Sequence, residues 1–156
     1  MPVIFFVCTA NIIRSPIASA IFARKLAEKG LTSDWQVASA GTWARDGYPA
    51  ARTSQDLLAP MGIDLSRHRS RMLQESLIKN ANLILVMEKG HKEALNIEFP
   101  AYKKRIFLLS EMIGIEADVH DPVGGTVDDF RDTIQNIQEL IDQGFDRIVQ
   151  LAKAGA

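Results

Sequence analysis

The sequence is nearly devoid of cysteine, since Cys8 is the single one among 156 residues. A lone cysteine cannot form a disulfide within the chain or a zinc site of the Cys-x-x-Cys type, so we expect a fold that does not depend on an oxidising compartment. The chain also lacks a long apolar run. Its apolar opening is ended early by Arg14 and has neither the basic start nor the small-residue cleavage site of a secretory signal. We therefore expect no membrane span and a cytoplasmic protein, which is the default without a targeting signal.

An excess of charge of one sign is absent too, because 18 basic and 19 acidic residues leave a formal net charge of −1. This balance predicts no bulk attraction to nucleic acid or to an anionic membrane, so any anion site must be local. Repeats, linkers and low-complexity tracts are also lacking. With 47% apolar and 24% charged residues the composition is that of an ordinary globular protein, and we expect a single domain over residues 1–156.

Short apolar runs alternate with amphipathic segments along the chain. Strands are predicted at Val3–Val7, Gln36–Gly41, Leu83–Met87 and Arg105–Leu109. Helices are predicted from Ser15 to Gly30, at Ala50–Met61, and over a last long segment that opens at Asp128. The alternation favours an α/β fold of three layers, in which a four-stranded parallel sheet has helices on both faces. Such folds bind ligands outside the carboxyl ends of their strands, so the loop after the first strand is the first candidate site.

That loop contains the only cysteine, in the pattern Cys-x5-Arg-Ser formed by Cys8, Arg14 and Ser15. Between a buried strand and a helix start, its backbone N–H groups can turn toward one point and form an anion nest. Arg14 can add a bidentate fork to two phosphate oxygens. The same donors favour a thiolate at Cys8. The pattern therefore predicts a cysteine nucleophile that attacks a phosphate, with charge stabilisation that requires no metal or other cofactor.

The remaining loop residues are interpreted as supports of this chemistry. Ser15 can donate a hydrogen bond to the sulfur and ease its departure when a phosphocysteine is hydrolysed. Asn11 tolerates the left-handed backbone that a sharply curled loop needs. The predicted phosphate-binding residues besides the cysteine and the arginine are Thr9, Ala10, Asn11, Ile12, Ile13 and Ser15.

Each of these residues also has an ordinary interpretation. Cys8 could be a buried cysteine that packs as a small hydrophobe. Arg14 could be a solvated arginine in the first turn of a helix, although a positive charge there opposes the helix dipole. Asn11 and Ser15 alone would be common turn and cap residues. The combination and its place after a buried strand favour the catalytic interpretation.

Three motifs extend the pattern over nearly the whole chain: Cys-x5-Arg-Ser-Pro from residue 8, Ser-Ala-Gly-Thr at 39–42, and Asp121-Pro122. In this order and length they resemble the low-molecular-weight protein tyrosine phosphatases. The resemblance implies a flavodoxin-like fold of the phosphatase I type, with Cys8 as nucleophile, Arg14 as phosphate clamp, and Asp121 as general acid and then base. It also implies that Ser39 and His68 support the loop. Without it, Asp121 would be taken for part of a surface turn and His68 for a solvated loop histidine.

The resemblance also bears on the substrate, through three expected rim residues: Ile12, Trp43 and Val123. In the family an isoleucine four residues after the cysteine accompanies phosphotyrosine, whereas a threonine there marks protein arginine phosphatases. Trp43 lies where an aromatic residue often borders the substrate ring. Val123 replaces an aromatic residue that is common after Asp-Pro. We expect a phosphotyrosine-containing protein or a small aryl phosphate as substrate, and the oligomeric state stays open.

Two departures from the family pattern concern the surroundings of the nucleophile. Ile13 occupies the position where many members have a second cysteine that can protect the first by a disulfide. Oxidation of Cys8 would therefore have to be reversed by an external thiol. Glu88 stands where some members have aspartate, so the support around the site is expected to differ.

Three rival functions share parts of the pattern. An arsenate reductase of the same fold passes electrons through further cysteines, and Cys8 has no partner in the chain. A non-catalytic phosphoprotein-binding module would keep Arg14 and the nest, but retention of both Cys8 and Asp121 argues against it. A flavodoxin-like carrier of flavin mononucleotide needs no cysteine nucleophile in its phosphate loop.

Overall fold

Four parallel strands form the centre of the computed structural model, which describes residues 1–155. The strands are β1 (Val3–Cys8), β2 (Gln36–Gly41), β3 (Leu83–Val86) and β4 (Ile106–Leu108). They lie in the order β2-β1-β3-β4, and all neighbouring pairs are parallel. In the register, Ile4 of β1 lies between Val37 of β2 and Leu83 of β3. The predicted four-stranded parallel sheet is confirmed.

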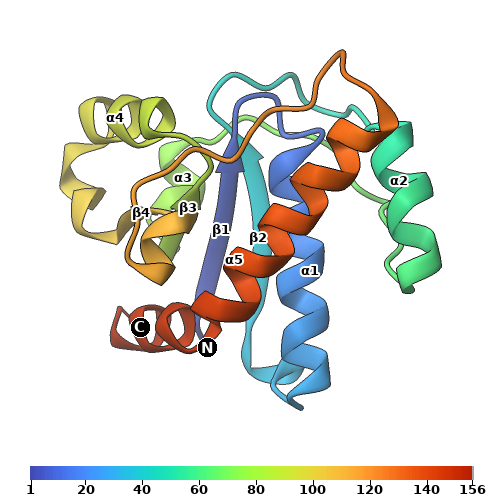
Figure 1. Cartoon of the computed structure of the whole chain (residues 1–156). Coiled ribbons are helices and arrows are strands. Elements are labelled where there is room, and N and C mark those ends of the chain that lie inside the picture. Colours follow the sequence, from blue (N-terminus) through green and yellow to red (C-terminus); the bar gives the residue numbers. More distant parts are fainter. Residues whose placement is uncertain (156) are drawn as a thin grey trace.

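Helices cover both faces of this sheet (Figure 1). The α-helices are α1 (Arg14–Glu28), α2 (Arg52–Leu58), α3 (Glu75–Ile78), α4 (Lys89–Glu98) and α5 (Val127–Ala154). Short 3-10 turns lie at Thr32–Asp34, Ala59–Met61, Pro100–Arg105 and Leu109–Ile113. α1 and α5 pack together over one face of the sheet, whereas α3 and α4 cover the other. No helix within residues 1–155 is both long and apolar enough to cross a bilayer.

The residues of β1 divide between two apolar clusters, one on each face. Ile4 and Phe6 pack in the cluster that includes residues of α1 and α5, and Phe5 and Val7 pack in the cluster beneath α3 and α4. All four side chains are buried. Because β1 is covered on both sides, its sequence is a continuous apolar run rather than an alternating one.

The helix boundaries differ from the predictions where proline or a cap intervenes. The helix predicted at Ala50–Met61 begins later, at Arg52. It also ends earlier, at Leu58, because Pro60 lacks the N–H that an α-helix needs and the chain tightens into the 3-10 turn Ala59–Met61. α5 begins one residue before Asp128. Thr126 caps it, accepting from the Asp129 N–H at 3.2 Å while the Asp129 carboxylate accepts from the Thr126 N–H at 2.9 Å.

The sheet has its switch in strand order at β1. The chain continues from β1 to β2 on one side and later returns to β3 on the other. Parallel sheets bind ligands at the carboxyl ends of strands beside such a switch. The loop Thr9–Ile13 leaves β1 at this point and leads into α1.

Candidate active site

The loop Thr9–Ile13 has the backbone of an anion site. Within residues 1–155, the N–H groups of Ala10 to Ile13 donate to no protein acceptor, and no side chain caps the start of α1. Unpaired N–H groups at a helix amino end are ready donors to an anion. A hollow of about 180 Å³ lies over the loop and is lined by Cys8, Thr9, Ala10, Ile12, Ile13, Arg14, Asp121 and Val123. The three residues predicted to be catalytic, Cys8, Arg14 and Asp121, thus line one hollow.

Asn11 holds the turn of the loop from beneath. It is fully buried and has φ +59°, the left-handed backbone that its residue type tolerates. Its Oδ1 accepts from the Arg71 N–H at 3.0 Å, which fixes the amide so that Nδ2 donates to Ser15 Oγ at 2.7 Å and to Ser39 Oγ at 3.0 Å. His68 Nε2 donates to the Asn11 carbonyl at 2.7 Å. Burial lowers the pKa of His68, which favours the neutral form of this ring.

Ser15 links this network to the cysteine. Its Oγ lies 3.0 Å from Cys8 Sγ. Because the Asn11 amide already donates to Ser15 Oγ, the hydroxyl hydrogen has two acceptors in reach, the sulfur at 3.0 Å and the Ala40 carbonyl at the longer distance of 3.4 Å, and the sulfur is the nearer one. A hydrogen bond to the charged form of a group stabilises that form. The arrangement therefore suits a thiolate at Cys8, and it suits the same thiolate as a leaving group.

Gly41, at the end of β2, lets the chain pass close beside the loop. A Cβ at this position would lie 2.3 Å from the Thr9 carbonyl oxygen. The close passage allows two hydrogen bonds to the loop, from the Thr42 N–H to the Cys8 carbonyl at 2.8 Å and from the Trp43 N–H to the Thr9 carbonyl at 3.0 Å. Glycine at 41 is therefore required by contact with the loop.

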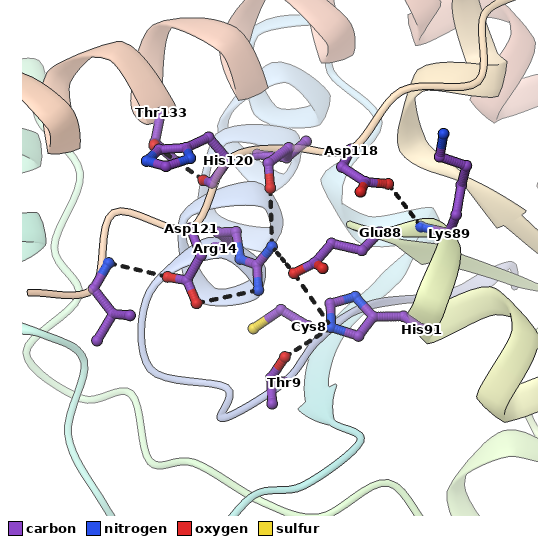
Figure 2. A network of polar contacts seen from close by, with 12 residues as sticks. Cys8, Thr9, Arg14, Glu88, Lys89, His91, Asp118, His120, Asp121 and Thr133 are labelled. Atoms are coloured by element: carbon purple, nitrogen blue, oxygen red, sulfur yellow. Dashed lines mark hydrogen bonds and ion pairs between the residues drawn. The ribbon is translucent and has the colours of Figure 1, made fainter.

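Arg14 is buried, with 2% of its side chain exposed, and its guanidinium is oriented by two close acceptors and one more distant one (Figure 2). Nη1 donates to Glu88 Oε2 at 2.5 Å and to the Val119 carbonyl at 2.9 Å. Nη2 lies 3.4 Å from Asp121 Oδ2, a longer and weaker contact. Nε donates to no protein group within residues 1–155, so the edge formed by Nε and Nη2 is the one suited to two phosphate oxygens.

Asp121 reaches the hollow from the loop that precedes α5. Its side chain is 38% exposed, and Oδ1 accepts from the Val123 N–H at 3.1 Å. The chain before it is tied to α5, because Thr133 Oγ1 donates to the His120 carbonyl at 3.2 Å. The carboxylate is thus held near Cys8 and Arg14 while one side of it stays open to solvent.

One further residue on this side of the loop, His91, was missed as part of the site. His91 is buried, and its Nε2 lies 2.8 Å from Thr9 Oγ1 and 3.8 Å from Glu88 Oε2. Its Nδ1 is buried without a partner among the described residues. Burial lowers the pKa of His91 although Glu88 opposes the shift. A sequence signal did exist: Glu88 and His91 follow β3 at its carboxyl end, the same edge of the sheet as Cys8.

The predicted rim residues are divided between two hollows. Val123 lines the hollow of Cys8, and Ile12 lines both that hollow and a second one beside it. Trp43 lines only the second hollow and is 81% exposed.

Comparisons with known proteins agree with this geometry. A family model described as low molecular weight phosphotyrosine protein phosphatase matches residues 3–154. A probable low molecular weight protein-tyrosine-phosphatase, EpsP from Ralstonia nicotianae, is 37% identical over 145 residues, which cover 93% of this chain and 94% of that protein. A protein-arginine-phosphatase from Bacillus subtilis is 36% identical over 141 residues, covering 90% and 92%. The crystal structure of a low molecular weight protein tyrosine phosphatase from T. tengcongensis has a TM-score of 0.89 and 37% identity, covering 94% of this chain and 99% of that one.

Proposed function

The chain belongs to the low molecular weight phosphotyrosine protein phosphatase family, and from that membership we propose that it dephosphorylates protein phosphotyrosine through a phosphocysteine intermediate. Members of the family hydrolyse phosphate monoesters, so the chain is a phosphatase. The assignment of roles to residues rests on one observation: Cys8, Arg14 and Asp121 line the same hollow above the loop Thr9–Ile13.

In the first step the Cys8 thiolate attacks phosphorus opposite the leaving oxygen. The S–P bond forms as the P–O bond to the phenol breaks, and Asp121 in its acid form gives a proton to that oxygen. The Nε and Nη2 edge of Arg14 and the N–H groups of the loop stabilise the charge on the three equatorial oxygens. Because these donors are fixed before the substrate binds, they stabilise the transition state without a cost of reorganisation during the reaction.

In the second step the same groups act in reverse. Asp121, now a carboxylate, takes a proton from a water molecule whose oxygen attacks phosphorus. The S–P bond breaks and its electron pair returns to Cys8. The hydroxyl of Ser15, 3.0 Å from the sulfur, stabilises the departing thiolate. Inorganic phosphate is released and the nucleophile is restored.

Loss of the nucleophile tests this assignment most simply. Cys8→Ser is expected to lower turnover of an aryl phosphate by about 10⁴-fold or more, because a serine hydroxyl is not ionised by the same donors. Binding of inorganic phosphate, measured by calorimetry, should persist because the loop and Arg14 are unchanged. Residual turnover comparable to that of the wild type would place the nucleophile elsewhere.

The rival functions are tested on the wild-type protein. Protein that binds phosphopeptides but releases no phosphate would be a binding module. Steady production of arsenite from arsenate and thiols would favour the arsenate reductase.

Phosphoarginine is the second candidate substrate, since a protein-arginine-phosphatase is 36% identical to this chain. Ile12 and Val123 favour phosphotyrosine, because apolar walls suit a phenyl ring better than a guanidinium that needs hydrogen-bond partners. Phosphotyrosine, phosphoserine and phosphoarginine peptides should be compared at equal concentration. We expect phosphotyrosine to be hydrolysed fastest, and Ile12→Thr to move the ratio toward phosphoarginine by about tenfold. Preference of the wild type for phosphoarginine would overturn the choice of substrate while leaving the reaction chemistry intact.

A further inference from the structure

A second hollow of about 350 Å³ adjoins that of Cys8. Both hollows are lined by Ala10 and Ile12, so a short stretch of the loop is their common wall. The other lining residues of the second hollow are Trp43, Arg45, Tyr48 and Ser70. A ligand that places its phosphate over Cys8 can therefore continue into the second hollow without leaving the surface.

The outer wall of this hollow is fixed by Ser70, which is buried. Ser70 Oγ donates to the Arg45 carbonyl at 2.5 Å and accepts from the Tyr48 N–H at 3.0 Å. The Ser70 backbone completes the brace, its N–H donating to the Tyr48 carbonyl at 2.7 Å and its carbonyl accepting from the Gly47 N–H at 2.8 Å. A wall held in this way needs little ordering when a ligand binds, which favours affinity.

The side chains on this wall have the chemistry of a recognition surface. Trp43 and Tyr48 are 81% and 51% exposed, so neither ring is used to fill the core. The Arg45 guanidinium is exposed and forms no hydrogen bond or ion pair within residues 1–155. Exposed tryptophan, tyrosine and arginine are the residue types that most often dominate binding energy at protein interfaces. Two apolar faces beside one cation fit a peptide segment that has an acidic side chain.

We propose that the hollow lined by Trp43, Arg45 and Tyr48 is a subsite for the residues that flank the phosphorylated residue of a protein substrate, and that Arg45 pairs with an acidic side chain among them. The proposal rests on the proposed phosphatase function and adds a preference for the sequence around the phosphate. An extended peptide advances about 3.3–3.6 Å per residue, so the neighbours of a residue bound over Cys8 lie above an adjoining hollow. A small aryl phosphate has no such neighbours and gains nothing from Arg45.

Two phosphotyrosine peptides that differ only in flanking glutamates or flanking lysines provide the test. For the wild type we expect kcat/KM to be about threefold to fivefold higher on the acidic peptide, the ratio that an exposed ion pair can supply. Arg45→Gln should remove this preference and Arg45→Glu should reverse it. Both variants should hydrolyse a small aryl phosphate within about twofold of the wild-type rate. Arg147→Glu is the matched control, since Arg147 is an exposed arginine on α5, and it should keep the wild-type preference.

The outcomes distinguish failure of the proposed subsite from failure of the proposed phosphatase function. Equal kcat/KM on the two peptides, or a preference that survives in Arg45→Glu, would refute the subsite although hydrolysis of the aryl phosphate continues. Absence of aryl phosphate hydrolysis by the wild type would refute the phosphatase function itself. Raising the salt concentration should bring the ratio of kcat/KM on the two peptides closer to one for the wild type, because exposed ion pairs are screened.

Discussion

The loop Thr9–Ile13 is held on two sides that differ in burial and in completeness of hydrogen bonding. On the Asn11 side the amide is fully buried, and its three side-chain hydrogen bonds measure 2.7–3.0 Å. On the Arg14 side the partner carboxylates Glu88 and Asp121 are 35% and 38% exposed, and one contact is as long as 3.4 Å. The buried Nδ1 of His91 on this second side has no partner among the described residues.

In the proposed mechanism, the difference corresponds to two tasks. A phosphate nest works only if its donors are fixed beforehand, and the satisfied, buried Asn11 side fixes them. A general acid must change protonation and exchange protons with water, and the open Arg14 side permits this. We therefore expect substitutions on the Asn11 side to lower the free energy of unfolding, and substitutions on the Arg14 side to lower the rate with little effect on stability.

Among substitutions on the two sides of the loop, Asp121→Ala should have the largest effect on rate with the least effect on stability. Turnover of aryl phosphates with poor leaving groups is expected to fall by about 10²–10⁴-fold, and that of good leaving groups much less, because a good leaving group needs little protonation. Rates across a series of substituted phenyl phosphates measure this. Asp128→Ala, which removes an exposed carboxylate of α5, is the control. Equal losses across the series would remove Asp121 from the acid role.

Asn11→Ala should show the opposite signature. It removes three hydrogen bonds, to the Ser15 and Ser39 hydroxyls and from the Arg71 N–H, so the free energy of unfolding is expected to fall by about 3 kcal/mol. Chemical denaturation measures this change. Asn11→Gly separates the loss of the side-chain hydrogen bonds from the strain of a left-handed backbone, because glycine removes the side chain but tolerates φ +59°. A loss below about 1 kcal/mol for the alanine variant would mean that Asn11 does not hold the loop.

Glu88→Gln should reduce kcat/KM by about tenfold while the unfolding free energy stays within about 1 kcal/mol of the wild type. The amide keeps an acceptor for Arg14 but loses the charge that makes the 2.5 Å contact strong. Glu93→Gln on the exposed face of α4 is the matched control. A loss of stability without a loss of rate would show that Glu88 supports the folded structure and not the reaction.

The smallest expected effect is a pH dependence of stability from His68. Burial lowers its pKa below the ordinary value of about 6.5, so above that pH the residue is neutral in both folded and unfolded chains and contributes no slope. As the pH falls below about 6.5 the unfolded chain binds the proton more readily, and the free energy of unfolding decreases until the pH reaches the folded-state pKa. His68→Gln should therefore reduce the slope of the denaturation midpoint against pH between pH 7 and pH 5, and the remaining slope is expected from His91, whose pKa burial also lowers. An unchanged slope would show that His68 does not contribute to it.

Parts of the site also differed in how far the sequence predicted them. Cys8, Arg14 and Ser15 lie close together in the chain, so their spacing and the strand before them sufficed to predict the loop and the positive φ of Asn11. His91 lies 82 residues from Thr9, and their contact depends on the pairing of β3 with β1. Neither the strand order nor the register follows from apolar periodicity.

Trp43 shows a second limit of sequence reasoning. Its place after β2 was expected from the family pattern, and the side chain was expected beside the substrate ring. The structure places it on the adjoining hollow, because the chain after Gly41 is directed by hydrogen bonds to Thr9 and by the brace at Ser70. These contacts join segments that are distant in sequence and include backbone atoms, which residue types do not reveal.

Direct detection of the phosphocysteine tests the central claim, that Cys8 attacks phosphorus and Asp121 serves both steps. In Asp121→Ala a substrate with a good leaving group should still phosphorylate the enzyme, whereas the missing base slows hydrolysis of the intermediate. Rapid acid quenching followed by mass spectrometry of the intact protein and its peptides is therefore expected to find one phosphoryl group on the peptide that contains Cys8. A burst of released phenol without any adduct on Cys8, or an adduct on another residue, would contradict the account.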